Sequence, residues 1–397
     1  MVNGPQAWRM LALVGLAELL GMAPWFAASA VSSSIVAEYH LTTAQAAWLT
    51  MAVQGGFVAG TLVAALLNLS DLVNPRWVFG IGCFGAAAAN ALVTSAPSPV
   101  EVVAWRFATG TALALVYPPG MKIVAGWFST RRGAALGILV ASLTLGKAVP
   151  YLLAALTGGT WRSMMLLSSV LAAAGGLVAI MTVKDGPLAT AAAAFDPRAA
   201  FRVFSRRGTR LGVLGYLGHM WELYAMWTWF GVYVTAAMAA RGAATAGRLG
   251  SIAAFAAIGA GAIGAVAAGF SADRRGRAHV AAWAMMVSAT CCALTVPAFR
   301  APFGVILLLA VVWGVSVVAD SAQFSAIVSE TTDDEYLGTA LTVQTCLGFL
   351  LTMVSIRLTS AVADWVGWQW AFLVVLPGPI LGVQAMVALM RPRIREE

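Results

Sequence analysis

The stretch ELLGMAPWF, residues 18–26, recurs 204 positions later as ELYAMWTWF, residues 222–230, with five of nine positions identical. Each copy begins with a glutamate, Glu18 or Glu222, inside an otherwise apolar segment. Glycines repeat at the same offset, as in Gly55 and Gly259, Gly60 and Gly264, and Gly110 and Gly314. The chain is therefore expected to be a doubled unit. An ionised group within lipid costs at least about 2.5–3.5 kcal/mol, so the two acids need a functional or pairing reason.

The composition predicts a membrane protein. The chain has 397 residues, of which 60% are hydrophobic and 10% charged, and its mean hydropathy is +0.84. Soluble domains carry about 25% charged residues. The net charge of +8 is not arranged as a nucleic-acid-binding patch, so no nucleic-acid partner is expected. The four cysteines lie in apolar segments without metal-ligand spacing and are interpreted as core residues.

Apolar stretches of about 20 residues, each long enough to cross a bilayer as a helix, can be placed twelve times. They cover residues 8–31, 46–67, 77–94, 102–127, 134–157, 162–183, 211–237, 249–271, 279–298, 302–328, 338–360 and 368–390. The basic stretch from Lys184 to Arg210 separates the sixth and seventh. We therefore predict an all-α integral membrane protein of two pseudo-symmetric six-helix bundles, residues 1–183 and 211–397, joined by a cytoplasmic linker, residues 184–210.

The distribution of basic residues predicts the orientation. With a cytoplasmic N-terminus, 16 Lys and Arg residues lie in cytoplasmic segments and 4 on the other side. The positive-inside rule therefore places both termini in the cytoplasm. The first span is expected to remain in place, since it is too long for a signal peptide.

The loop between the eighth and ninth spans reads GFSADRRGR, residues 269–277. It matches the G-x-x-x-D-R-x-G-R loop of the major facilitator superfamily, which the chain resembles over its whole length. The resemblance implies a cytoplasmic gate in which the aspartate pairs with basic groups near a helix end. The gate residues would be Gly269, Asp273, Arg274, Gly276 and Arg277, together with Asp71 and Arg76 of the equivalent N-terminal loop, which lacks the glycine and the basic pair.

Two further motifs narrow the resemblance. Arg106 and Gly110 form an R-x-x-x-G element on the fourth span, where the superfamily commonly links the arginine to proton or substrate coupling. The G-P-x-x-G element of many drug antiporters is replaced by GKAVP, residues 146–150. This stretch, YPPGMK (residues 117–122) and ADSAQFS (residues 319–325) resemble the bacterial nitrate/nitrite- and cyanate-permease-like group. The nitrate signature itself is missing, so the chain is not interpreted as a nitrate carrier.

Ionisable residues gather at similar depth in the predicted spans. At 1.5 Å per residue, Glu18 and Glu222 lie near mid-bilayer. On the seventh span His219, Glu222, Met226 and Trp229 share one helical face, and Glu18, Met22 and Trp25 form the matching stripe. Arg357 lies near a span end, where it can snorkel. The expected substrate and coupling residues are Glu18, Trp25, Arg106, Tyr117, Lys122, Lys147, His219, Glu222, Trp229, Asp320 and Gln323.

These residues leave alternatives open. Glu222, helped by His219, is expected to take up and release a proton, but it could instead be a structural acid paired with a basic residue. Lys122 and Lys147 favour a small organic or inorganic anion as substrate. If both lysines neutralise acids, a zwitterionic or neutral solute fits instead. Export of drugs or amphipathic cations by proton antiport is a further alternative.

The sequence thus predicts a secondary transporter that works by alternating access between two halves. No phosphate-binding G-x-x-x-x-G-K-[ST] loop occurs, and the three histidines supply no catalytic or metal cluster, so neither an enzyme nor a cofactor is expected. The expected partners are a small-molecule substrate, protons and the lipid bilayer. We expect a monomer in the bacterial inner membrane.

Overall fold

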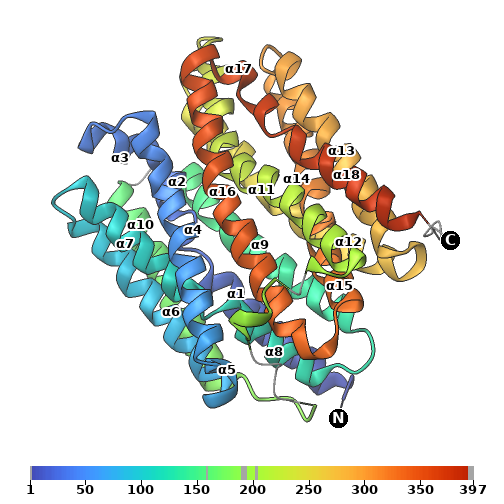
Figure 1. The fold of residues 1–397 in the computed structure, drawn as a ribbon. Coiled ribbons are helices and arrows are strands. Elements are labelled where there is room, and N and C mark those ends of the chain that lie inside the picture. Colours follow the sequence, from blue (N-terminus) through green and yellow to red (C-terminus); the bar gives the residue numbers. More distant parts are fainter. Residues whose placement is uncertain (1, 158–159, 189–194, 202–203, 392–397) are drawn as a thin grey trace.

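The computed structural model describes residues 2–157, 160–188, 195–201 and 204–391, without the side chains of Ser70, Asp71, Arg132, Ala199 and Asp334. The described residues form helices and no strand (Figure 1). The first half contains α1 (Pro5–Gly21), α2 (Ala27–Ala30), α3 (Ser32–Tyr39), α4 (Thr43–Leu66), α5 (Leu69–Leu72), α6 (Pro75–Leu92), α7 (Pro99–Leu113), α8 (Tyr117–Trp127), α9 (Arg132–Thr157) and α10 (Trp161–Thr182).

The second half begins with α11 (Arg207–Ala239), the longest helix of the described residues. It continues with α12 (Ala246–Arg275), α13 (Arg277–Ala298), α14 (Phe303–Ala319), α15 (Ser321–Thr331), α16 (Leu337–Val366), α17 (Trp368–Ala371) and α18 (Pro377–Met390). Short 3-10 turns lie at Val93–Ser95, Pro197–Ala199, Asp334–Tyr336 and Phe372–Val374.

Ten helical segments are long and apolar enough to cross a membrane among the residues that the structure describes. The two predicted spans that do not reach this threshold are 8–31 and 211–237, the pair that carries the repeated stretch. The first is divided, because α1 ends at Gly21. The second is the continuous helix α11, whose apolar character is reduced by His219, Glu222 and several aromatic residues.

Four predicted spans are interrupted rather than continuous. The first divides at residues 22–26, around Pro24, which has no backbone N–H to continue the helix. The fourth divides between α7 and α8, and Pro118 and Pro119 occupy the first turn after the break. The tenth divides at Asp320, which ends α14 and precedes α15. The twelfth divides between α17 and α18. Backbone groups freed at such breaks must find partners inside the protein, because lipid offers none.

The two halves pack through small residues at one helix pair and through aromatic rings at another. Helices α9 and α12 lie against each other, as do α4 and α16. A Cβ atom at Gly137 on α9 would lie 3.3 Å from the Ala265 carbonyl oxygen on α12. Between α4 and α16, the rings of Phe57 and Phe349 are 4.5 Å apart. In Figure 1, α9 and α16 lie in the middle of the view, with α4, α6, α7 and α10 on the left and α13, α14 and α18 on the right.

Candidate functional site

Arg106 is fully buried on α7 and hydrogen-bonds to the backbone at the break in the first span. Its guanidinium donates to the carbonyl oxygens of Pro24 at 2.9 Å and Trp25 at 2.5 Å. It also donates to Leu49 O at 3.1 Å and to Asn90 Oδ1 at 2.8 Å. The carbonyls that the break frees therefore have a donor. Because its N–H groups are used in this way, Arg106 is a positioning residue in this conformation rather than a ligand for solute.

Lys147 lies in a box of aromatic rings between the two halves, formed by Trp25, Tyr224 and Trp227. Its ammonium nitrogen is 3.9, 5.0 and 5.5 Å from these three ring centroids, respectively. It donates one hydrogen bond of 2.6 Å, to the Tyr224 hydroxyl, and all four side chains are buried. An ammonium has three N–H donors, and one has an acceptor among the described residues. The box can therefore offer a positive charge to a further acceptor.

Contacts within and across the halves hold the box in place. The Tyr151 hydroxyl on α9 donates to the Trp227 carbonyl oxygen on α11 at 3.2 Å. The ring of Trp25 packs against Phe57 of α4 at 5.1 Å and Phe349 of α16 at 5.8 Å. The box thus touches the helices that join the two halves, so that their relative movement must alter it.

Glu18 is a fully buried carboxyl on α1. Neither of its oxygens has a hydrogen-bond partner among the described residues. Lys147 acts on it electrostatically but does not hydrogen-bond to it. A Cβ atom at Gly120 would lie 2.9 Å from Glu18 Oε2, so α8 approaches the carboxyl through a glycine. A hydrogen-bonded ion pair between Glu18 and Lys147, one of the alternatives that the sequence left open, is not formed among the described residues.

Glu222, the repeat partner of Glu18, has a different environment. Its Oε1 accepts hydrogen bonds from the Ser288 hydroxyl at 2.7 Å and from Trp313 Nε1 at 2.6 Å. These donors are neutral and come from α13 and α14, so the structural alternative of a basic partner for Glu222 is not what the structure shows. The carboxyl is held inside the second half.

His219 contacts Asp320 rather than Glu222. Its Nδ1 is 2.8 Å from Asp320 Oδ1, although the two atoms are not aligned as a hydrogen bond. Both side chains are buried, and Asp320 lies at the break between α14 and α15. Gln323, one turn later, is buried with an Oε1 that has no partner among the described residues. The break therefore gathers an acid, an imidazole and an amide.

The other predicted site residues lie at the margins of these groups. Trp229 donates to Ile356 O at 2.9 Å and packs on Trp368, so it joins α11 to α16 and α17. Tyr117 begins α8 beside the break in the fourth span, and Lys122 lies one turn further, half-buried. The structure does not bring Trp229 into the aromatic box, although the sequence places it on the face of Glu222.

The predicted gate residues around Gly276 lie at the turn between α12 and α13, and the pairing of Asp273 with basic groups stays a prediction. Gly276 has a φ of +84°, which permits the sharp turn between α12 and α13. Arg277 pairs with Glu330 of α15 at 2.6 Å. Asp273 faces α9, because a Cβ atom at Gly133 would lie 3.9 Å from the Asp273 Oδ1. Gly269 also faces α9, because a Cβ atom at Gly269 would lie 3.5 Å from the Gly133 carbonyl oxygen.

The remaining gate residues lie nearby on both halves. Arg274 is exposed beside Asp273. The Arg76 guanidinium reaches Val183 O at 3.5 Å. The side chain of Asp71 lies outside the described residues, so its predicted gate role stays a prediction.

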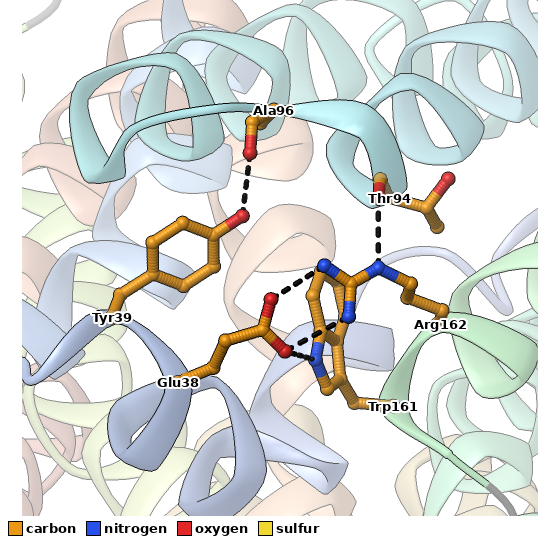
Figure 2. Close-up of polar contacts among 6 residues, drawn as sticks. All are labelled: Glu38, Tyr39, Thr94, Ala96, Trp161 and Arg162. Atoms are coloured by element: carbon orange, nitrogen blue, oxygen red, sulfur yellow. Dashed lines mark hydrogen bonds and ion pairs between the residues drawn. The ribbon is translucent and has the colours of Figure 1, made fainter.

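An ionic cluster ties α3 to α10 at the predicted outer surface (Figure 2). Arg162 makes two hydrogen bonds to Glu38, of 2.8 and 2.5 Å, and Trp161 Nε1 donates a third of 2.6 Å. The hydrogen bonds from Arg162, and then the one from Trp161, hold the pKa of the Glu38 carboxyl below its usual value. Tyr39 donates to Ala96 O at 2.6 Å. The cluster is exposed, so it orders the end of the bundle rather than the buried site.

Sequence reasoning missed Asn90, Ser288, Trp313 and the hydroxyl of Tyr224 as partners of the buried charges. Asn90 is a fully buried amide near the C-terminal end of α6, and a polar residue within an apolar span was the available signal. Ser288 and Trp313 carry no comparable signal, because serine and tryptophan are common in membrane helices. Among the described residues, no group of His, Cys, Asp and Glu side chains could hold a metal ion.

Comparison with known proteins agrees with this architecture. The chain resembles a crystal structure of the nucleoside transporter NupG, with a TM-score of 0.72 at 14% identity, over 97% of this chain and 100% of that chain. A crystal structure of a NupG mutant gives a TM-score of 0.70 at 14% identity, over 96% of this chain and 100% of the other. Such identities support a shared fold alone.

A sequence relative is the probable actinorhodin transporter of Streptomyces coelicolor (strain ATCC BAA-471 / A3(2) / M145), 23% identical over 186 residues. The match spans 45% of this chain and 32% of that protein, which is about a third of the relative's length. The sequence model described as Major Facilitator Superfamily matches residues 14–261. This match spans more than half of the chain, and together with the transporter fold it shows that the protein is a member of the Major Facilitator Superfamily of membrane transporters.

Proposed function

We propose that this transporter carries a small organic anion by proton-coupled alternating access. In this proposal twelve spans form two bundles, residues 1–183 and 211–397, joined by residues 184–210. The protein is a monomer in the bacterial inner membrane with both termini in the cytoplasm. The broken spans and the pairing of α9 with α12 and of α4 with α16 support a movement of one bundle against the other around a central site.

The observation that carries the proposal is the buried Lys147 ammonium between the halves. Its single hydrogen bond, to Tyr224, leaves two N–H donors without acceptors among the described residues, and a buried charge without a counter-ion is costly. A solute carboxylate supplies that counter-ion, while the rings of Trp25 and Trp227 provide apolar faces for the rest of the solute. The resemblance to nitrate/nitrite- and cyanate-type permeases agrees with an anion.

Glu18 is our candidate for the coupling proton. Its buried carboxyl has no hydrogen-bond donor among the described residues, and an unpaired carboxylate in such surroundings is strongly disfavoured. Binding a proton removes this cost, and so does an approach of the Lys147 ammonium. If the anion draws Lys147 away, Glu18 requires a proton, which links solute and proton binding. Glu222 and the His219–Asp320 pair are proposed to complete the proton pathway in the second half.

Binding of defined anions tests the substrate proposal. We would measure thermal shifts of purified protein with benzoate, acetate, nitrate and tetraphenylphosphonium, followed by uptake of the stabilising compounds into proteoliposomes. We expect stabilisation by benzoate, lost in Lys147→Met and retained in the control Lys184→Met, which removes a charge from the predicted linker. If benzoate stabilised Lys147→Met as much as it stabilises wild type, this result would contradict the proposal.

A second candidate is export of an amphipathic cation by proton antiport. The aromatic box already holds a cation, the Lys147 ammonium, at 3.9 Å from the Trp25 ring centroid, and Glu18 could serve as counter-ion for a cationic solute. Stabilisation by tetraphenylphosphonium alone, strengthened in Lys147→Met and abolished in Glu18→Gln, would favour this function over anion transport.

Proton coupling is tested separately in proteoliposomes. We expect Glu18→Gln to lose accumulation driven by a proton gradient while retaining exchange of solute across the membrane. Glu222→Gln is the matched comparison, since it removes the repeat-related acid. Loss of accumulation in Glu222→Gln would extend the proton pathway to the second half. Normal accumulation in Glu18→Gln would remove Glu18 from the mechanism.

A further inference from the structure

A groove lies on the exposed side of the second half, between α12, α13 and α14. Its volume is about 710 Å³. Its walls are mainly apolar, and at one end they include two groups that can carry positive charge, Arg275 and His279. This groove is separate from the aromatic box around Lys147, because none of the residues of the box lines it.

The length of the groove along α12 matches the hydrocarbon thickness of one lipid leaflet. On α12 its lining extends from Gly264 to Arg275, about 16 Å at 1.5 Å per residue. Half of a hydrocarbon core of about 30 Å is about 15 Å. The lining residues Trp283 and Val312 are 67% and 40% exposed, so the groove opens to the surroundings of the bundle. A tryptophan near the charged end is typical of a helix at the membrane interface.

The charged end of the groove carries net positive charge. Arg275 and His279 are exposed, and Arg275 makes no ion pair among the described residues. The neighbouring Arg277 is neutralised by Glu330. Asp273 faces Gly133 on α9, and two residues along a helix point to nearly opposite sides, so this acid does not neutralise Arg275. The predicted orientation places this end at the cytoplasmic surface.

We propose that the groove binds one anionic phospholipid of the cytoplasmic leaflet. Its phosphate is held by Arg275 and His279, and one acyl chain lies along the apolar wall formed by Ala267, Val287 and Val312. Basic pockets between membrane helices on the cytoplasmic side are suited to anionic headgroups. The apolar wall selects a lipid over a free phosphate, and the basic end selects an anionic lipid over a neutral or zwitterionic one.

The position of the groove gives the lipid an influence on the packing of α12. Helix α12 forms one wall, and its Gly269 contacts the Gly133 carbonyl of α9. Gly264, which also lines the groove, lies against Val315 of α14, where a Cβ atom would be 2.0 Å from the carbonyl oxygen. A lipid wedged beside this tight crossing holds α12 against its neighbours within the second half.

Lipid retention by the full-length protein tests the proposal independently of transport. We would measure by native mass spectrometry the affinity for phosphatidylglycerol and for phosphatidylcholine. The variants are Arg275→Gln combined with His279→Gln, and Ala267→Phe, which fills the groove without changing charge. The controls are Arg248→Gln, at the opposite end of α12, and Ile263→Phe, an exposed residue of α12 that does not line the groove.

We expect wild type to bind phosphatidylglycerol about tenfold more tightly than phosphatidylcholine. This preference should disappear in the double variant, and binding of both lipids should weaken in Ala267→Phe. The controls should resemble wild type. Equal binding of the two lipids by wild type, or unchanged preference in the double variant, overturns the proposal. Displacement of the lipid by millimolar inorganic phosphate would show that the acyl chain contributes nothing, and overturns it as well.

A folding defect is distinguished by the elution profile and the thermal unfolding midpoint in lipid-free detergent. If Ala267→Phe misfolds, Val312→Phe fills the groove from α14 and replaces it. Loss of phosphatidylglycerol in the Arg248→Gln control to the same extent as in the double variant would mean that binding is a general effect of charge, and the assigned site is then wrong.

Discussion

Replacement of Arg106 by methionine should loosen the break in the first span. The guanidinium donates to the carbonyls of Pro24, Trp25 and Leu49 and to the side chain of Asn90. A buried acceptor that loses its donor costs about 1–3 kcal/mol. Methionine fits the apolar surroundings and removes the cost of burying a charge, which offsets part of this loss. We therefore expect the free energy of unfolding to fall by about 2–4 kcal/mol.

The matched control is Arg357→Met. Arg357 also lies in a membrane helix, but its side chain makes a single hydrogen bond among the described residues, of 3.2 Å to the Ser360 hydroxyl. The same substitution there should cost about 1 kcal/mol or less. The Arg106→Lys variant keeps the charge with three donors in place of the planar fork, so it should recover part of the loss.

Steric trapping in bicelles gives the free energy of unfolding, and hydrogen exchange reports on the backbone of residues 22–30. We expect Arg106→Met to be the least stable variant and its exchange to rise in this segment before others. If Arg106→Met and Arg357→Met lose equal stability, or if exchange in residues 22–30 stays at the wild-type rate, Arg106 does not hold the break and the reasoning is refuted.

Three other predictions concern the box, the outer surface and the helix crossings. Tyr224→Phe removes the acceptor of a buried ammonium and should lower the free energy of unfolding by about 1.5–3 kcal/mol, with a larger thermal shift on adding benzoate than in wild type. Glu38 has a pKa below its ordinary 4.5, so its bonds to Arg162 stabilise the folded state above pH 4.5, and this stabilisation is lost as pH falls through the folded-state pKa. In Glu38→Gln the thermal unfolding midpoint should therefore depend less on pH in the acidic range than in wild type. Gly110→Ala would place a Cβ 2.0 Å from an α4 carbonyl oxygen and should cost about 1–3 kcal/mol or more, whereas Gly247→Ala, with open space around it, should leave the midpoint unchanged.

The helical fold could be predicted because membrane spans are encoded locally. Length and hydropathy of each segment suffice, and the positions of the predicted spans agree with the helices to within a few residues at most ends. The breaks were harder to predict. Pro24 indicated the first, but the break at Asp320 has no proline or glycine and depends on the packing of α14 and α15.

Partners of the buried charges could not be predicted from the sequence. The depth of a residue is expected from its position in a span, and Lys147 does act electrostatically on Glu18. The partner depends on how each helix is rotated about its axis, which the packing of all its neighbours determines. For this reason Arg106 binds backbone carbonyls and His219 turns to Asp320.

The two acids of the repeated stretch have different hydrogen-bond partners. Glu18 and Glu222 occupy the same place in their copies, yet Glu222 receives hydrogen bonds from Ser288 and Trp313 while Glu18 receives none among the described residues. A carboxyl with two donors has its hydrogen-bonding capacity partly satisfied, whereas a buried carboxyl without donors depends on a proton or on a counter-ion. Lys147 is the nearby cation, and it makes one hydrogen bond among the described residues. The difference between the copies therefore favours Glu18 as the acid that couples proton and solute, with Glu222 held by its two donors in a supporting role.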